Sequence, residues 1–134
     1  MPPAAEVSLS EQLKKIPPAM RPTVKAAIKT VKQVAPQADE IAYRSQAPRS
    51  KSAMWKIARY TADGSNVVGI GTFPGHATLF FYRGRELDDG SGLLHGSGKD
   101  SRFLTLSGPA DAERPIVKRL IRKAFKLGGP ASNT

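Results

Sequence analysis

The centre of the sequence holds its clearest structural signal, in residues 54–82: MWKIARYTADGSNVVGIGTFPGHATLFFY. Aromatic and aliphatic residues that favour strands are concentrated in residues 54–61, 67–73 and 77–82. The turn sequences Asp63-Gly64-Ser65-Asn66 and Pro74-Gly75-His76 separate these segments by only a few residues. Because such short links join antiparallel neighbours, the pattern predicts three strands of a β-meander.

Two further segments extend the predicted sheet. Residues 41–45 precede the meander and mix aliphatic, aromatic and polar side chains. Residues 103–106 follow it after a long polar stretch, and they again combine an aromatic residue with leucines. Both segments are typical of strands.

Helical patterns flank the sheet segments on both sides. Leu9, Leu13 and Ile16 indicate a short helix that ends at the following prolines. Residues 18–35 carry apolar side chains at a period of 3.6, with lysines on the opposite side. Residues 115–127 divide completely into an apolar half and a basic half. Helices before and after a meander predict an α+β fold, in which N-terminal and C-terminal helices pack on one face of an antiparallel sheet.

The length and composition indicate one domain. The chain has 134 residues and no long linker or internal repeat, and most single domains hold about 100–150 residues. We expect a flexible N-terminal arm over residues 1–10, the domain over residues 11–127 and a disordered tail over residues 128–134.

Composition also excludes several kinds of protein. The chain has no cysteine, so it holds no disulfide, thiolate zinc site, iron–sulfur cluster or cysteine nucleophile. No apolar run approaches the roughly 18 residues of a membrane-spanning helix, and the N-terminus does not resemble a signal peptide. We therefore expect a cytoplasmic protein. The 21 Lys and Arg residues against 11 Asp and Glu give a net charge of +10, which favours an anionic partner.

A glycine-rich loop is the most unusual segment, over residues 90–102: GSGLLHGSGKDSR. Glycines allow backbone N–H groups to converge on an anion, and Lys99 and Arg102 add positive charge. The loop is not a Walker A motif, because Leu93 and Asp100 stand where that motif requires Gly and Ser or Thr. The alternative is a purely structural loop whose glycines adopt positive φ angles.

The sequence predicts no catalytic residues and no metal site. Its two histidines, His76 and His95, lie in predicted turns or loops, and no nucleophile or metal-ligand spacing accompanies them. An enzymatic role would depend on His95 as a general base. We therefore predict a protein that is not an enzyme and that needs no cofactor.

The basic half of the C-terminal helix suggests an alternative, non-specific binding of nucleic acid. Its cations are Lys118, Arg119, Arg122, Lys123 and Lys126. Against this alternative, the sequence lacks nucleic-acid recognition motifs such as RNP1 or the GXXG loop of KH domains. The aromatic residues at 73, 80, 81 and 82 also occupy strand patterns that predict core positions rather than an exposed stacking platform.

Residues 76–102 resemble the YdhG-like family, also called domain of unknown function 1801. In that family an aromatic-rich strand precedes an Arg-Gly-x-x-Leu turn and a Leu-x-Gly-x-Gly-Lys-x-x-Arg loop. The matching residues here are Arg83, Gly84, Leu87, Leu94, Gly96, Gly98, Lys99 and Arg102. The resemblance extends over roughly residues 11–127 and implies an α+β domain of unknown biochemical role.

Some relatives in that family are described as frataxin-like iron chaperones, which would imply carboxylates for cation binding. This sequence differs, because its helices are basic and its adjacent acidic pairs are Asp39-Glu40 and Asp88-Asp89. Our leading hypothesis is a non-enzymatic module that binds an anionic small molecule or an acidic protein through the glycine-rich loop. The expected ligand-binding residues are Arg83, His95, Gly96, Gly98, Lys99 and Arg102.

Overall fold

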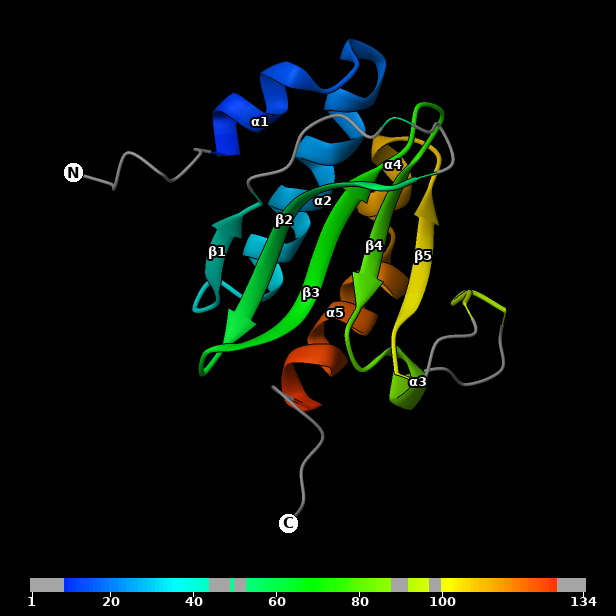
Figure 1. Ribbon diagram of the computed structural model, residues 1–134. Coiled ribbons are helices and arrows are strands. Elements are labelled where there is room, and N and C mark those ends of the chain that lie inside the picture. Colours follow the sequence, from blue (N-terminus) through cyan, green and yellow to red (C-terminus); the bar gives the residue numbers. More distant parts are fainter. Residues whose placement is uncertain (1–8, 44–48, 50–52, 88–91, 97–99, 128–134) are drawn as a thin grey trace, which may run out of the picture.

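A five-stranded antiparallel sheet in the order β1-β2-β3-β4-β5 forms the centre of the protein (Figure 1). The computed structural model describes residues 9–43, 49, 53–87, 92–96 and 100–127. The strands are β1 (Asp39–Ala42), β2 (Trp55–Ala62), β3 (Ser65–Thr72), β4 (Ala77–Phe81) and β5 (Arg102–Leu106). Every strand pairs with its neighbour in the sequence, so the predicted meander is confirmed.

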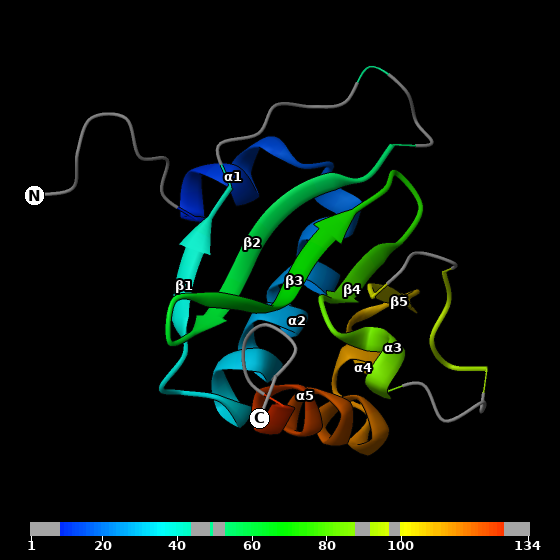
Figure 2. The same ribbon diagram turned by 60° about the horizontal axis from the view of Figure 1, so that its bottom comes forward.

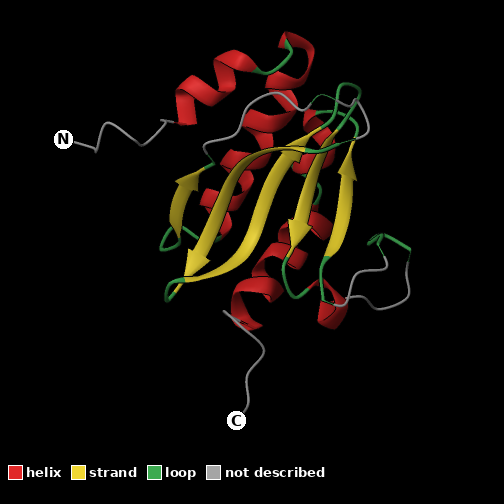
Figure 3. Cartoon of the chain, viewed as in Figure 1, coloured by secondary structure: helices red, strands yellow, loops and turns green. Residues whose placement is uncertain are grey.

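The helices gather on one face of this sheet, which Figures 2 and 3 show from two directions. They are α1 (Leu9–Lys15), the 3-10 helix η1 (Pro18–Met20), α2 (Arg21–Val34), α3 (Gly84–Leu87), α4 (Pro109–Ala112) and α5 (Pro115–Leu127). Helices α2 and α5 both contact β3. The predicted α+β class, with N-terminal and C-terminal helices on one side of an antiparallel sheet, is confirmed.

Three local predictions differ from the structure. Strand β1 begins at Asp39 and ends at Ala42, so it lies earlier than the predicted residues 41–45. Helix α1 spans Leu9–Lys15, so it includes Leu9 as predicted, and its first two residues overlap the expected arm over residues 1–10. The short helices α3 and α4 were not predicted, because four residues are too few to show a helical period. The predicted terminal segments 1–8 and 128–134 lie outside the described residues.

The hydrophobic core fills the space between α2, α5 and the sheet. Ile70, Leu79 and Phe81 are fully buried on the helix-facing side of the sheet, where Val24 of α2 and Ile121 of α5 are also fully buried. Burying one such side chain contributes about 1.5–3 kcal/mol. Every second residue of a strand points into this core, and the residues between them must therefore point to the opposite side of the sheet.

We call that opposite side the outer face. The strand register places one residue from each strand in a single line across it, because each is paired with the next. A bridge between His95 and Phe103 adds a sixth position beyond β5. This cross-strand row consists of Ile41, Arg59, Gly69, Phe80, Phe103 and His95.

A close contact at Gly69 fixes the middle of the row. A Cβ atom at this position would overlap the ring of Phe80, so the ring lies directly over the glycine backbone. Phe80 is consequently only 6% exposed although no helix covers the outer face. The missing side chain of Gly69 thus lets an aromatic ring lie flat on the sheet.

We expect Gly69→Ala to destabilise the protein by about 1–3 kcal/mol, because the Phe80 ring must move to make room for the new methyl group. Urea unfolding at equilibrium measures this difference. Gly75→Ala is the matched control, since Gly75 has open space around its Cβ position. It should change stability by less than about 0.5 kcal/mol. Equal stability of the two variants would contradict the contact.

Candidate functional site

The structure places the predicted ligand residues of the glycine-rich loop in different surroundings. Gly98 and Lys99 lie outside the described residues. The other four, Arg83, His95, Gly96 and Arg102, are described, and each has a distinct position. Their contacts determine whether they can act together on one ligand.

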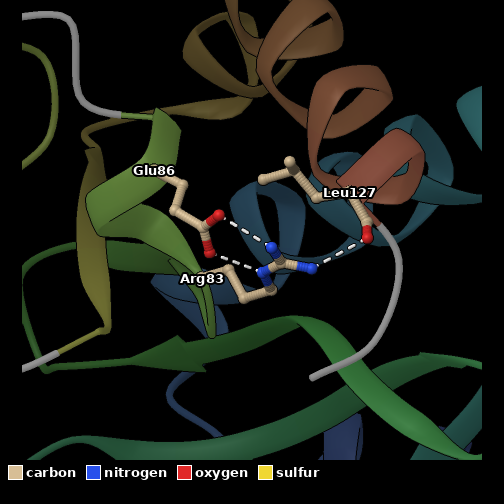
Figure 4. Close-up of polar contacts among 3 residues, drawn as sticks. All are labelled: Arg83, Glu86 and Leu127. Carbon is tan, nitrogen blue, oxygen red and sulfur yellow. Dashed lines mark hydrogen bonds and ion pairs between the residues drawn. The ribbon is translucent and has the colours of Figure 1, made fainter. Parts of the chain in front are cut away.

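Arg83 is held by a set of hydrogen bonds at the end of α5 (Figure 4). Its Nε and Nη2 atoms donate to the carboxylate oxygens of Glu86 at 2.6 Å and 2.7 Å, and Nη1 donates to the Leu127 carbonyl oxygen at 2.8 Å. Hydrogen bonding with Glu86 raises the pKa of Arg83 and lowers the pKa of Glu86. The guanidinium therefore joins α3 to one of the last carbonyl groups of α5, which otherwise lacks a helical donor.

His95 and Arg102 point to opposite sides of β5. The backbone N–H of His95 donates to the Phe103 oxygen at 2.8 Å, and that of Phe103 donates to the His95 oxygen at 2.7 Å. Directly paired residues project from the same face, so His95 extends the outer face beside Phe103. Arg102 precedes Phe103 in the strand and faces the other way, and its Nη1 donates to the Ser101 oxygen.

Gly96 has a conformational role next to this bridge. Its φ angle is +119°, a value that residues with side chains rarely adopt, and the Phe103 ring lies 3.1 Å from its ideal Cβ position. The described candidates thus have different surroundings: the backbone of Arg102 lies against Gly84, which follows Arg83, whereas His95 lies on the outer face.

A second group of polar and aromatic side chains gathers on the outer face. The hydroxyl groups of Tyr43 and Tyr82 are 2.6 Å apart and share a hydrogen bond. The Arg59 guanidinium carbon and the Lys56 Nζ atom each lie 5.7 Å from the centre of the Tyr43 ring. Phe80 packs edge-on against Tyr82, with 5.6 Å between ring centres. We call these residues, Tyr43, Lys56, Arg59, Phe80 and Tyr82, the outer-face cluster.

This group corrects part of the sequence analysis, which predicted core positions for four aromatic residues. Phe81 is fully buried in the core, as predicted. Phe80 is buried instead on the outer face against Gly69, and Tyr82 is half-buried beside it. Phe73 is half-buried in the turn between β3 and β4, where its ring stacks on His76 at 4.7 Å. Because adjacent strand residues face opposite sides, Phe80 and Phe81 cannot share one core.

Arg59 has unused hydrogen-bonding capacity. Its Nε atom is buried and has no hydrogen-bond partner in the described part of the chain. The tyrosine pair also keeps one donor, because a single hydrogen bond between two hydroxyl groups uses only one of their two O–H groups. Burial and the bond to Tyr43 raise the pKa of Tyr82, so its hydroxyl stays protonated at neutral pH. A guanidinium and a phenol O–H together form a donor set suited to an oxyanion.

The basic half of α5 lies on the other side of the domain. Arg119, Arg122, Lys123 and Lys126 are exposed and Lys118 is half-buried, while the apolar half of the helix faces the core. The sheet lies between these cations and the outer face (Figure 1). Arg119 and Lys123 also border a small pocket of about 50 Å³. Its remaining lining residues are Leu87, Leu93, Leu94, Ile116 and Leu120.

Among the described residues, no group of three or more His, Asp or Glu side chains could hold a metal ion. None of the helices in the same part of the chain is long and apolar enough to cross a membrane.

In comparisons with protein-family models, with curated proteins and with solved structures, nothing matches this chain. The resemblance to the YdhG-like family therefore stays a prediction from the residues quoted above.

We expect alkaline titration to identify the two tyrosines that the fold protects. Burial is the main cause that raises the pKa of Tyr60 and of Tyr82; the Tyr60 hydroxyl also donates to Glu40 at 2.7 Å. The folded-state pKa of each group is higher than its unfolded value of about 10. The free energy of unfolding is therefore unaffected by these groups below about pH 10 and decreases as the pH rises above it. Phenolate absorbance of these two residues should therefore appear only as the protein unfolds.

The chain has three tyrosines, so Tyr60→Phe leaves Tyr43 and Tyr82, and the further variant Tyr60→Phe/Tyr82→Phe shows which part of the absorbance belongs to Tyr82. Near-ultraviolet absorbance during titration, with circular dichroism to monitor folding, gives the measurement. Ionisation of Tyr82 near pH 10 in a folded protein would contradict the buried hydroxyl pair.

Proposed function

We propose that this protein is a non-enzymatic, cytoplasmic binding module for an anionic ligand, and that the ligand binds at the outer-face cluster. The observation that carries the proposal is the position of Arg59. Its buried Nε lacks a partner among the described residues, and it lies beside two tyrosine hydroxyls that share one hydrogen bond. Buried donors are nearly always satisfied, so an unpartnered donor among the described residues is unusual, and a bound anion would supply this guanidinium with an acceptor.

The charges around Arg59 favour the same ligand class. Within the part of the chain that the structure describes, Arg59 forms no ion pair, whereas Arg83 is neutralised by Glu86. Lys56 adds a second cation next to the Tyr43 ring. Side chains alternate between the two faces along a strand, so among the carboxylates of the described strands only that of Asp39, in the edge strand β1, lies on the outer face. An incoming anion therefore meets a predominantly positive surface, and the net charge of +10 adds long-range attraction.

The donor geometry selects oxyanions over other anions. A guanidinium presents several N–H groups in one plane, which matches the oxygens of a carboxylate or a phosphate. A tyrosine O–H adds a neutral donor that brings no competing charge. Hydrogen bonds to charged groups contribute about 1.5–3 kcal/mol each, so the loss of one of these donors should weaken binding measurably.

The alternatives have less support among the described residues. Anion binding by the glycine-rich loop would rely on Arg102 and on Lys99, which lies outside them, because Arg83 already pairs with Glu86. Non-specific nucleic-acid binding by α5 rests on its exposed cations alone. An iron-chaperone-like role would need a cluster of carboxylates, and no such group occurs in the described ranges.

Inorganic pyrophosphate is a suitable probe for this site. Isothermal titration calorimetry should show binding to the wild-type protein, and Arg59→Gln should weaken it about tenfold or more, since a loss of about 1.4 kcal/mol is tenfold. Tyr82→Phe should weaken it less, because it removes a neutral donor.

Arg122→Gln is the matched control, since it removes one exposed cation from the opposite side of the domain. Its affinity for pyrophosphate should stay within about twofold of the wild-type value, because only distant, screened charge is lost. An Arg59→Gln protein that binds as the wild type does would refute the site. Equal losses in the two variants would point to net charge rather than to the outer-face cluster.

A further inference from the structure

We infer that the anionic ligand of the outer face is single-stranded nucleic acid, whose bases stack on rings along the cross-strand row while Arg59 and Lys56 contact its phosphates. This inference rests on the proposed function, since it places the phosphate at the same donors. It adds a second kind of contact, made by aromatic rings at other positions of the same face.

Exposed apolar side chains occur at two separate positions of the row. Phe103 is 36% exposed on β5 and Ile41 is 37% exposed on β1. Among the large hydrophobic residues that the structure describes, these two alone are exposed, and the register places both in one line with Arg59. Part of the Phe103 ring lies against Gly96, and the exposed remainder is the part on which a base would stack. A small oxyanion at Arg59 would leave this ring uncovered.

The spacing along the row suits a short stretch of nucleotides. Arg59 on β2 and Phe103 on β5 are separated by three strand intervals. At about 4.8 Å per interval, the two positions are about 14 Å apart. Sheets of four strands that bind RNA stack about two or three bases across a comparable width. The half-buried ring of Tyr43 lies beside Arg59, and its hydroxyl group meets that of Tyr82.

The nature of the contact favours single strands over duplexes. An open sheet face offers rings to bases that are not already stacked, whereas in a duplex both faces of each base are occupied. A duplex would reach only the cations of this face, and Lys56 and Arg59 supply few phosphate contacts. The basic half of α5 presents more cations, and the aromatic residue of this helix, Phe125, is half-buried against the core, so α5 would bind both forms alike.

Because the two surfaces lie on opposite sides of the domain, substitutions can separate them. Phe103→Leu removes the ring and keeps an apolar side chain, and Phe103→Ala removes both. The matched control combines Lys118→Gln, Arg122→Gln and Lys126→Gln, which leaves the outer face and the buried side of α5 unchanged.

The experiment is fluorescence anisotropy with labelled oligouridylate and oligothymidylate of about eight nucleotides, within the usual site sizes of single-strand binders, and with a duplex of the same length. At about 0.15 M salt we expect single strands to bind more tightly than the duplex. Phe103→Ala should weaken single-strand binding about fivefold or more, and Phe103→Leu should lose most of the same amount. The α5 triple variant should stay within about twofold for single strands. Circular dichroism confirms that each variant is folded.

The outcomes distinguish this inference from the proposed function. If Arg59→Gln abolishes pyrophosphate binding but Phe103→Ala leaves oligonucleotide binding unchanged, the face binds anions and the stacking inference is wrong. If the α5 triple variant loses single-strand binding, or if the duplex binds as tightly as the single strands, the inference is also overturned. Loss of oligonucleotide binding in Phe103→Ala, with pyrophosphate binding retained, supports it.

Discussion

Helices cover one face of the sheet, no described helix covers the other face, and the rest of the structure depends on this one-sided packing. Because successive strand residues point in opposite directions, each strand must divide its side chains between a dry core and a surface. The side chains of Ile70, Leu79 and Phe81 point into the core, while those of Arg59, Phe80 and Phe103 point to the outer face. The open face stays ordered because Gly69 lets the Phe80 ring lie against the backbone, so rings pack on the sheet itself.

Two arginines of this fold differ in role, and their hydrogen-bond partners explain the difference. Arg83 uses its donors on Glu86 and on a carbonyl of the final turn of α5, so its guanidinium holds two elements together. Arg59 lies over a tyrosine ring, and its buried Nε has no acceptor among the described residues. A charged group that is partly desolvated without a partner costs free energy, and a bound anion offsets that cost.

Much of the architecture could be predicted from the sequence, because local sequence patterns determine its helices and strands. The division of residues 115–127 into apolar and basic halves gave the bounds of α5, and the turns after β2 and β3 gave the meander. The outer-face cluster was missed because Tyr43 and Tyr82 are 39 residues apart and meet only through the fold. One sequence signal could have indicated it. Phe80 and Phe81 are neighbours in a strand, so their side chains point to opposite faces of the sheet and only one of them can face the helices. The bidentate contact of Arg83 with Glu86 joins residues three apart in the sequence, but the bond of Arg83 to Leu127 joins residues 44 apart and depends on the fold.

The central claim is that ligand binding belongs to the open sheet face and not to the glycine-rich loop or the basic helix. Nuclear magnetic resonance of the isotope-labelled protein tests it most directly, because the Arg59 side-chain Nε–H and the Phe103 and Tyr82 rings give separate signals. On addition of a short single-stranded oligonucleotide, the account predicts that these signals shift together and saturate at one ligand concentration, while the backbone of α5 stays unperturbed. Shifts confined to residues 118–126, with the Arg59 Nε–H signal unchanged, would contradict it.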